Sequence, residues 1–340
     1  MIVRRNDIRV CASLLLGLIA TGDALAQASL LETGRHPHRS AQTDRYPLKP
    51  IRLIVPFPPG GGTDVVSRTL AQKLTEAFGQ PVIVDNRPGA GGAMGAESAV
   101  RAAPDAYTLM VVSSSYATNA AFFNLPYDAV TDVTPISMIA DTGFLVALHP
   151  NVEATSIREL IELVKTKPGV LNYGAAGIGS LNHLAMSLFD IMAGTRMTLV
   201  PYKGTAAVLN DLLGGQIQLT FGSMPAVLPL VKANRLRGIG VTTLKRNSAV
   251  PELPAIHEIL PGYETTVWFG VLGPRGLPKK ISMRWRAEIY TAMQTREMKH
   301  RLADGGLEPS EATDEAFREV LKRDIKKWKK VVAEAGIKPV

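Results

Sequence analysis

Glycine and hydroxyl-bearing residues that could hold an anion follow a short apolar segment in the first third of the chain. The segment reads Ile51-Arg-Leu-Ile-Val-Pro-Phe-Pro-Pro-Gly-Gly-Gly-Thr-Asp64, in which a strand-like run passes through prolines and glycines into a helical pattern. Prolines end the strand because they have no N–H to donate, and the glycines let a ligand approach the main chain. The helix that follows offers free N–H groups at its start, with Asp64 or Thr63 as its predicted N-cap. The pattern predicts an anion-binding turn, and a turn without a ligand fits it equally well.

Similar segments recur where other predicted strands end. In an open sheet built from strand–helix units, ligands gather at the carboxyl ends of the strands. The loops at these ends are rich in glycine, serine and threonine and poor in charge, so they can supply many N–H and hydroxyl groups but few acids or bases. We therefore predict one anion-binding site built from several loops. They comprise residues 57–64, 87–92, 113–119, 174–180, 201–204 and 221–223.

Motifs for catalysis are absent from the sequence or incomplete. There is no G-x-S-x-G elbow and no G-x-x-x-x-G-K-[ST] loop. Gly89-Ala-Gly-Gly-Ala-Met94 begins like a dinucleotide fingerprint, but Met94 stands where the third glycine belongs. Asp64 and His183 are the candidates for acid–base chemistry, and neither has an evident partner; His183 is also compatible with a structural role. Binding without a cofactor or a metal is the simpler interpretation, and an exported enzyme that uses the same cleft is the alternative.

Residues 1–26 have the organisation of an export signal. Arginines at positions 4, 5 and 9 precede an apolar core at residues 10–20 and an Ala-Leu-Ala cleavage motif that ends at Ala26. The single cysteine, Cys11, lies inside this signal, so the mature chain has no thiol for a disulfide or a metal site. No later segment has the roughly 18 consecutive apolar residues that a membrane span requires. The sequence predicts an exported protein whose signal is cleaved after Ala26.

Two polar stretches look like binding sites but have simpler interpretations. The polar composition of residues 27–46 predicts a flexible linker. His36 and His38 within it make a poor metal site without further ligands. The net charge of the whole chain is +8, and basic residues cluster at positions 322–330. Apolar residues recur at helical spacing through the same stretch, so the lysines form the solvent-facing side of an amphipathic helix. We therefore predict no nucleic-acid partner.

From Tyr46 onward, predicted strands and helices alternate. The 340 residues exceed what one core usually holds, so two domains are expected. Repeated strand–helix units predict an α/β fold with largely parallel sheets covered by helices on both faces. We expect strands at 51–55, 81–86, 107–112, 171–174, 197–200, 217–221, 237–241 and 266–272, a strand pair at 136–148, helices that include 66–78, 157–167 and 181–192, and two or three helices at the C-terminal end.

A series of motifs runs in order through nearly the whole mature chain. After the segment that ends at Asp64 come Val84-x-Asn-Arg-Pro-Gly-Ala-Gly-Gly92, Leu125-Pro-Tyr-Asp128, Leu171-Asn-Tyr173, Gly177-x-Gly-Ser180, His183-Leu-Ala185, Val200-Pro-Tyr-Lys-Gly204, Asp211-Leu-Leu-Gly-Gly-Gln216 and Trp328. The series resembles the Bug-type (TctC-like) extracytoplasmic substrate-binding receptors of tripartite tricarboxylate transporters. Because it covers most of the chain, the resemblance is more specific than any single motif.

The resemblance implies a two-lobed, periplasmic-binding-protein type II-like fold, with two mostly parallel sheets flanked by helices and a ligand cleft between the lobes. The chain would cross between the lobes twice, so that lobe 1 comprises residues 47–146 and 266–340 and lobe 2 comprises residues 147–265. Receptors of this family capture small carboxylates for the membrane subunits of a transporter. Related receptors signal instead through a sensor kinase, which the sequence does not distinguish from transport. The resemblance implies a monomer that is not an enzyme.

The ligand-binding residues that we expect lie in strand-end loops of both lobes. Family members often carry an acidic or amide residue where this sequence has Gly222-Ser223, and an aspartate near there can pair with the amino group of a ligand. We therefore expect a carboxylate without an α-amino group, either a di- or tricarboxylate or an aromatic acid. The expected residues are Phe57, Pro59, Gly60, Gly61, Gly62, Thr63, Asp64, Ser113, Ser114, Ser115, Gly174, Ala175, Ala176, Gly177, Gly179, Ser180, His183, Tyr202, Gly222 and Ser223.

Overall fold

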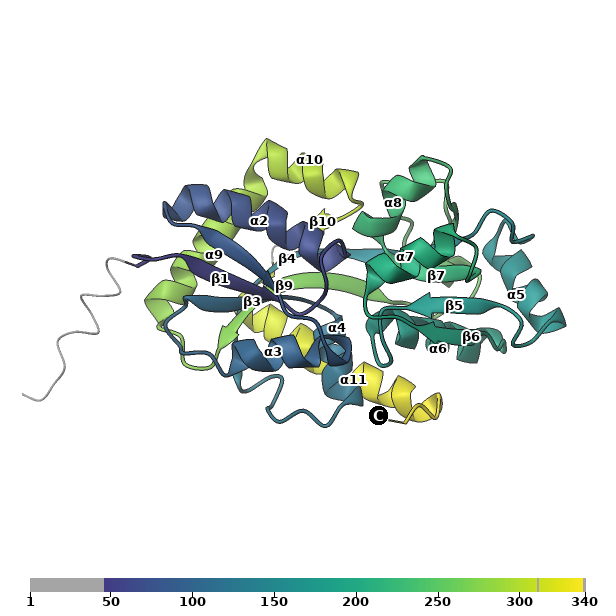
Figure 1. Cartoon of the computed structure of the whole chain (residues 1–340), viewed down its shortest axis with the longest axis horizontal. Coiled ribbons are helices and arrows are strands. Elements are labelled where there is room, and N and C mark those ends of the chain that lie inside the picture. The colour runs from purple at the N-terminus through teal and green to yellow at the C-terminus, as the bar shows by residue number, and fades with distance from the viewer. Residues whose placement is uncertain (1–45, 311, 339–340) are drawn as a thin grey trace, which may run out of the picture. The chain divides into compact units, whose positions relative to one another are not determined.

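The computed structural model describes residues 46–310 and 312–338 as alternating strands and helices (Figure 1). The predicted export signal lies outside these residues, as does the predicted linker apart from Tyr46. Tyr46 is not linker: it is 3% exposed, its hydroxyl donates to the Ala106 carbonyl at 2.7 Å, and Trp285 Nε1 donates to it at 2.7 Å. The linker prediction was therefore wrong at this residue, because an aromatic side chain that finds both apolar and hydrogen-bonding neighbours is stable in a core.

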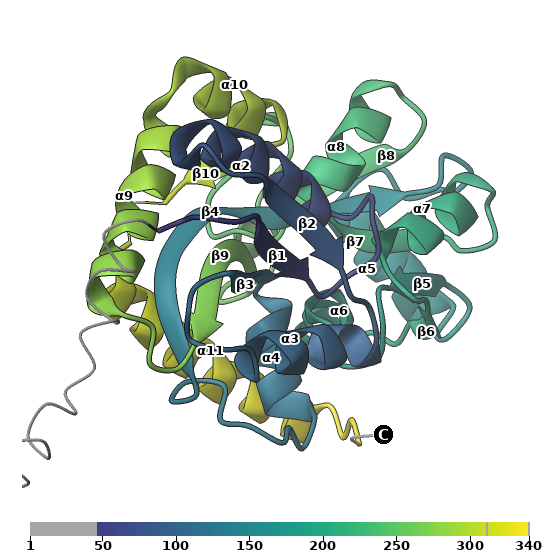
Figure 2. The same cartoon turned by 60° about the vertical axis from the view of Figure 1, so that its left-hand side comes forward.

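Three parallel strands form one group in the sheet. The elements of this group are β1 (Ile51–Val55), α2 (Gly62–Phe78), β2 (Val82–Asn86), η1 (Ala90–Gly92), α3 (Ala93–Val100), β3 (Thr108–Ser113) and α4 (Ser115–Phe122). β1 lies between β2 and β3, with Val55 opposite Asn86 and Leu53 opposite Leu109. α2 covers one face of these strands and α3 the other (Figure 2). The carboxyl ends of all three strands therefore reach the same edge of the sheet.

A second group of strands is also parallel. Its elements are α5 (Ile157–Thr166), β5 (Asn172–Ala175), α6 (Leu181–Ala193), β6 (Thr198–Pro201), α7 (Thr205–Leu213), β7 (Leu219–Ser223), α8 (Met224–Lys232), β8 (Arg237–Val241) and η2 (Ile256–Glu258). β5 pairs in parallel with β6 and with β7, where Tyr173 lies opposite Leu219. β8 belongs to the same sheet through an antiparallel neighbour described next. The strand ends of this group form a second set of loops.

Two long strands, β4 (Val133–Leu148) and β9 (Thr266–Pro274), join the two groups. β4 pairs with β9 as far as Gly143, and from Phe144 it pairs with β7 and β8. All of these pairings are antiparallel, and β9 also pairs antiparallel with β3. The prediction of largely parallel sheets thus describes β1–β3 and β5–β7, and the two joining strands run the other way.

The predicted strand pair at residues 136–148 is a single strand of 16 residues. The prediction of a pair was wrong because the run continues through Gly143 as one extended strand. A Cβ at Gly143 would lie 3.0 Å from Thr243 Cγ2 and 3.2 Å from the Thr243 nitrogen. Glycine is therefore required by the close approach of another segment to an extended strand, and not by a change of chain direction.

The C-terminal part consists of α9 (Lys279–Gln294), α10 (Arg296–Asp304), the short strand β10 (Glu308–Pro309) and α11 (Asp314–Glu334). α11 is amphipathic, as predicted: Phe317, Leu321 and Trp328 are buried, whereas Lys322 and Lys329 are exposed. Within the described residues, no helix has the length and apolarity that a membrane span needs. The basic cluster is thus one face of a helix that packs on the sheet.

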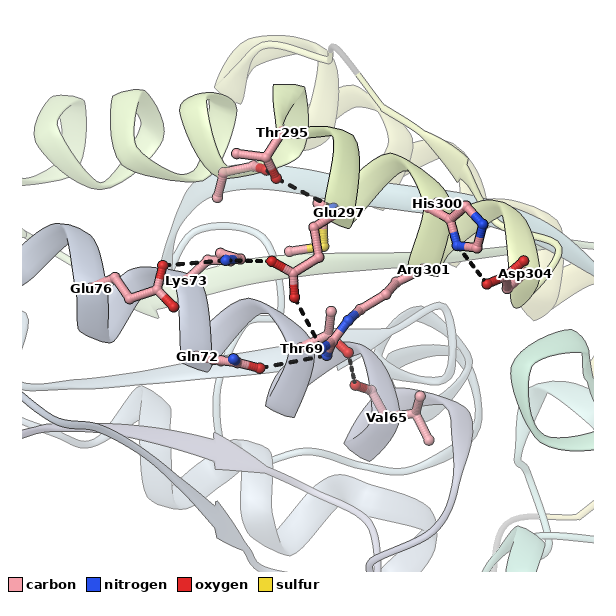
Figure 3. A network of polar contacts seen from close by, with 12 residues as sticks. Val65, Thr69, Gln72, Lys73, Glu76, Thr295, Glu297, His300, Arg301 and Asp304 are labelled. Carbon is pink, nitrogen blue, oxygen red and sulfur yellow. Dashed lines mark hydrogen bonds and ion pairs between the residues drawn. The ribbon is translucent and has the colours of Figure 1, made fainter.

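Ion pairs attach α10 to α2 (Figure 3). Lys73 Nζ lies 2.6 Å from Glu297 Oε2 and 3.2 Å from Glu76 Oε2, and Arg301 Nη2 lies 3.0 Å from Glu297 Oε1. Gln72 accepts a further hydrogen bond from Arg301 at 3.5 Å. The Lys73 side chain is only 17% exposed. These contacts attach the middle of α2 to α10, and this attachment helps to position both ends of α2.

Candidate functional site

A cavity of about 50 Å³ lies between the strand-end loops of the two groups. At about 10–15 Å³ per water, it has room for roughly three to five water molecules. None of the described residues that line it carries a charge. These residues are Phe57, Pro58, Gly61, Gly62, Thr63, Ser113, Ser115, Phe144, Ala176, Leu181, Asn182, Thr205, Ser223, Val267 and Phe269.

Five helices begin at this cavity. Gly62 and Thr63 open α2, Ser115 opens α4, Leu181 opens α6 and Thr205 opens α7. Ser223 is the N-cap of α8, and in none of the five helices does the side chain of the N-cap residue accept a hydrogen bond from the helix. The first N–H groups of a helix have no partner within the helix, and its N-terminus carries a partial positive charge. Together these five ends form an environment for negative charge that requires no lysine or arginine.

The prediction of the N-cap of α2 was wrong. The helix begins at Gly62 with Gly61 as its N-cap, so neither Thr63 nor Asp64 caps it. Sequence reasoning favoured an oxygen-bearing cap, but the glycine turn continues directly into the helix. The Asp64 carboxylate instead accepts a hydrogen bond from the Gly60 nitrogen at 3.0 Å and pairs with Arg68. Burial would raise the pKa of Asp64, but hydrogen bonds from Arg68, Gly60 and Asn86 outweigh it and hold the pKa below its usual value.

Hydroxyl groups surround the N-termini. Ser113 ends β3, and the Ser115 hydroxyl accepts from the Leu181 nitrogen across the cavity at 3.5 Å. The Ser223 Oγ is buried and makes no hydrogen bond to the described residues. A buried hydroxyl without a partner is costly, so this atom is suited to a bound ligand or water. Ser114 is turned away from the cavity, because its hydroxyl bonds to Thr266 and Trp268 of β9.

The first turn of α6 presents an amide to the cavity. Asn182 Oδ1 accepts from the Ser180 hydroxyl at 2.7 Å and from the Ala176 nitrogen at 3.3 Å. Its Nδ2 is therefore the atom of this side chain that can donate to a ligand. The Ser180 Oγ also lies 2.5 Å from the Gly177 carbonyl, and its single hydrogen can be donated to either acceptor, so Ser180 stabilises the loop from within.

His183 and Tyr202, both expected at the ligand, lie behind the cavity wall. His183 Nδ1 accepts from the Gly179 nitrogen at 3.1 Å, and burial lowers the pKa of this histidine to about 4. The Tyr202 hydroxyl donates to Asp211 at 2.7 Å, and burial together with this bond raises the pKa of the tyrosine to about 12. Both residues fix loops of the site without lining it.

Gly222 faces away from the cavity. A Cβ there would lie 2.1 Å from Val227 Cγ2, because alternate residues of β7 point to opposite faces and Gly222 packs under α8. Ser223 is the residue of this pair that lines the cavity. The argument from a missing side chain at Gly222 was therefore wrong in its geometry, and the chemistry of the wall at this point depends on Ser223.

The cavity brings together eight of the expected residues and leaves twelve in or beside the same loops. Those that line it are Phe57, Gly61, Gly62, Thr63, Ser113, Ser115, Ala176 and Ser223. Those that do not are Pro59, Gly60, Asp64, Ser114, Gly174, Ala175, Gly177, Gly179, Ser180, His183, Tyr202 and Gly222. Sequence reasoning missed Phe144, Leu181, Asn182, Thr205, Val267 and Phe269 and did not commit to Pro58.

Some of the missed residues carried a signal in the sequence. Thr205 follows Gly204 at the start of a helix, as Thr63 follows Gly62, so the same glycine–threonine pair occurs in both groups of loops. Asn182 is the second residue of α6, whose N-cap is Ser180. Phe144, Val267 and Phe269 are interior residues of β4 and β9, and nothing local distinguishes them from core residues.

The loops of the two groups touch around the cavity. A Cβ at Gly62 would lie 2.1 Å from Ser223 Oγ, and one at Gly204 would lie 2.9 Å from Pro58 Cγ. A Cβ at Gly177 would come within 3.5 Å of Gly91 Cα. A ligand of several carbon atoms can therefore enter only when these loops separate. Across the part of the chain that the structure describes, no cluster of histidine, cysteine and acidic residues could hold a metal ion.

Comparisons with known proteins agree with this architecture. A family model described as tripartite tricarboxylate transporter family receptor (TctC) matches residues 66–337. Protein BugT of Bordetella pertussis is 36% identical over 299 residues, which cover 87% of this chain and 92% of that protein.

Solved structures show the same fold. Rpa4515 of R. palustris, solved with adipate, is 35% identical with a TM-score of 0.83, covering 87% of this chain and 100% of that one. MatC from Rhodopseudomonas palustris, with bound malate, is 27% identical with a TM-score of 0.80, covering 84% and 100%. The resemblance noted in the sequence and the two-lobed α/β fold are thereby confirmed. The chain belongs to the tripartite tricarboxylate transporter receptor family, whose members are periplasmic binding proteins.

Proposed function

We propose that this protein captures a small organic dicarboxylate between its lobes and presents it to the membrane subunits of a tripartite tricarboxylate transporter. It acts as a periplasmic monomer after cleavage behind Ala26, and it performs no chemistry on the ligand. The lobes are residues 47–146 with 266–340, and residues 147–265. The change of strand partners along β4, at Gly143 and Phe144, supports a boundary in this region.

The observation that carries the proposal is the convergence of five helix N-termini, none of them capped by its own N-cap side chain, on a cavity whose lining has no charged residue. The N-termini of α2 and α4 supply N–H groups from one lobe, and those of α6, α7 and α8 supply them from the other. Two sets of donors on opposite walls suit a ligand with an anionic group at each end. Closure would follow because such a ligand binds the closed state better than the open one.

The apolar part of the wall suits a short carbon chain between the two anionic groups. Phe57, Phe144, Leu181, Val267 and Phe269 contribute apolar surface to the cavity. Two relatives were solved with adipate and with malate, which are dicarboxylates without an amino group. An α-ammonium group would face the positive ends of the helices and find no carboxylate among the lining residues. We therefore infer that amino acids are excluded, for this reason and not because of Gly222.

Matched ligand pairs test the proposal. Purified protein comprising residues 27–340 is titrated calorimetrically with malate and aspartate, which differ in a hydroxyl against an ammonium group. Adipate and hexanoate form a second pair, which differs in one carboxylate. At least one of the two dicarboxylates, malate or adipate, should bind. The compound matched with it, aspartate or hexanoate, should bind more weakly by about 100-fold or more, or about 2.7 kcal/mol.

Each ligand that binds should also raise the melting temperature, and at equal concentration the tighter ligand should raise it more. Equal binding of aspartate and malate would disprove the exclusion of amino groups and leave the receptor intact. No binding of any tested carboxylate would contradict the proposed function.

A further inference from the structure

Asn86, the last residue of β2, holds the loop that follows β1. Its Nδ2 donates to the Phe57 carbonyl at 2.9 Å and to Asp64 Oδ1 at 2.9 Å. Its Oδ1 accepts from Arg68 Nη2 at 2.9 Å. Both hydrogens of the carboxamide are thereby used. Asn86 does not line the cavity, so its contacts act on the loop and not on a ligand.

Asp64 provides the second attachment of the same loop. Its Oδ2 accepts from the Gly60 nitrogen at 3.0 Å and from Arg68 Nε at 3.0 Å, and Arg68 Nη2 lies 2.9 Å from its Oδ1. The Arg68 guanidinium thus binds the carboxylate with two nitrogens, which is a geometrically specific arrangement. We call Asn86, Asp64 and Arg68 the loop bracket.

The bracket fixes the loop on both sides of its prolines. The attached atoms are the Phe57 carbonyl and the Gly60 nitrogen, and the cavity-lining residues Phe57, Gly61 and Gly62 lie at or next to these points. Gly60 has a φ of +85°, a conformation that a free glycine adopts as only one of many. Without the bracket, ligand binding would have to order this segment, and that entropic cost would weaken affinity.

The bracket also separates a negative charge from the anion site. Asp64 lies on the first turn of α2, beside the N-terminus that faces the cavity. An uncompensated carboxylate there would oppose an anionic ligand, and the Arg68 guanidinium neutralises it. The Asp64 carboxylate bonds to Gly60 and not to Gly61, Gly62 or Thr63, so the N–H groups next to the cavity are not used by it.

We propose that Asn86 and Arg68 are positioning residues that hold residues 57–62 in their anion-binding conformation, Asn86 through the Phe57 carbonyl and Asp64, and Arg68 through Asp64. The proposal rests on the proposed function for its effect on affinity. Its structural part, the order of the loop, is independent of which ligand binds.

The first test compares Asn86→Ala with Thr75→Val. Thr75 joins the opposite ends of α2 and β2, since its Oγ1 accepts from the Val82 nitrogen at 3.0 Å, so its variant is a control for general loosening of this pair. In the ligand-free protein, hydrogen exchange of the amides of residues 60–64 should be faster by about tenfold in Asn86→Ala and unchanged in Thr75→Val. With adipate and malate as probes, Kd should rise about tenfold in Asn86→Ala, while Thr75→Val lowers only the melting temperature.

A second test uses Arg68, whose exposed side chain can be removed with little risk to folding. Arg101→Ala is the matched control, because Arg101 forms an ion pair of the same i,i+4 spacing with Glu97, at 2.8 Å on α3. Arg68→Ala should raise Kd for both probes, and Arg101→Ala should not. The Asn86→Ala/Arg68→Ala double variant should lose less than the sum of the two single losses, because both residues act through Asp64.

The two proposals can fail separately. Unchanged exchange of residues 60–64 in both Asn86→Ala and Arg68→Ala overturns the positioning role, whatever the ligand data show. Faster exchange with unchanged Kd for a probe that binds the wild type also overturns it. If the wild type binds neither probe, the proposed function fails, and the exchange measurement alone decides whether the bracket orders the loop.

Discussion

At the scale of single residues, the structure separates residues that line the cavity from residues that support its loops. Ser223 and Asn182 present polar atoms to the cavity. His183 and Asp64 lie behind it and accept hydrogen bonds from backbone nitrogens of its loops. The supporting group contains the titratable side chains of these loops, and the lining group contains none. Substitutions in the first group should therefore act through loop order and protein stability.

His183 makes stability depend on pH. Burial lowers its pKa in the folded protein from 6.5 to about 4, so the unfolded chain binds a proton between these values and the folded chain does not. Neutral His183 therefore contributes in full to the free energy of unfolding above about pH 6.5. This contribution, which amounts to at most about 3 kcal/mol, is lost as the pH falls toward 4. His183→Asn keeps an acceptor for the Gly179 nitrogen but does not titrate.

We expect the melting temperature of His183→Asn to fall less than that of the wild type between about pH 7 and about pH 4.5. His300→Asn is the control, since His300 is exposed on α10 beside Asp304. Equal acid sensitivity of the wild type and His183→Asn would show that the buried histidine is not the titrating group.

At the scale of elements, the proposed site offers helix termini to an anion where many anion sites offer charged side chains. Each of the five helices has eight or more residues, enough to align its peptide dipoles. Their directions are fixed by the sheet that they pack on and by contacts such as those between α2 and α10. Loosening such a contact should therefore affect the protein as a whole more than an exposed ion pair elsewhere does.

Glu297 tests this expectation. It pairs with both Lys73 and Arg301, and the hydrogen bond from Lys73 holds the pKa of Glu297 below its usual value. Glu297→Gln should lower the melting temperature at low salt, and the difference from the wild type should shrink at about 0.5 M NaCl.

Glu334→Gln serves as the control, because Glu334 forms a more exposed pair with Lys330 on α11 at 3.6 Å. Its melting temperature should stay at the wild-type value. A shift as large as that of Glu297→Gln would contradict a special role for the contact between α2 and α10.

The same scale shows why the elements were largely predictable. Apolar runs bounded by glycine and proline fixed the strands to within a residue or two, as in the predicted strand 266–272 and the observed Thr266–Pro274. The amphipathic pattern likewise predicted 157–167, and the helix is Ile157–Thr166. Residues 136–148 were predicted as a strand pair, but they belong to one strand in which Gly143 allows the close approach of Thr243.

At the scale of the whole molecule, the proposed closure of the lobes would depend on contacts between loops that are far apart in the chain. Loop residues of the site could be predicted because strand ends meet at one edge of a sheet. Phe144, Val267 and Phe269 could not, because they reach the cavity only through the crossing of β4 and β9. A long-range pairing of this kind leaves no mark in local sequence.

Gly62→Ala tests closure directly. The new Cβ would lie 2.1 Å from Ser223 Oγ, so the two walls could no longer approach as they do here. Alanine favours helix more than glycine does, so the stability of the ligand-free protein should not fall. Kd for adipate should rise about tenfold or more, and small-angle scattering should show a smaller decrease in the radius of gyration on ligand addition.

Gly214→Ala, at the end of α7, is the control and should bind adipate normally. Ser223→Gly in the Gly62→Ala background should restore part of the lost compaction, because it removes the clashing oxygen. If Gly62→Ala compacts and binds as the wild type does, the contact between Gly62 and Ser223 is not part of the closed state.

The absence of charged side chains from the cavity lining has a consequence for the environment in which such a receptor operates. Peptide N–H groups and hydroxyls neither gain nor lose protons over the range in which carboxylates, histidines and lysines do. A site built from peptide groups should therefore keep its affinity for a fully ionised acid across the pH range in which the folded loops behind it are stable, because no group of the lining changes its charge.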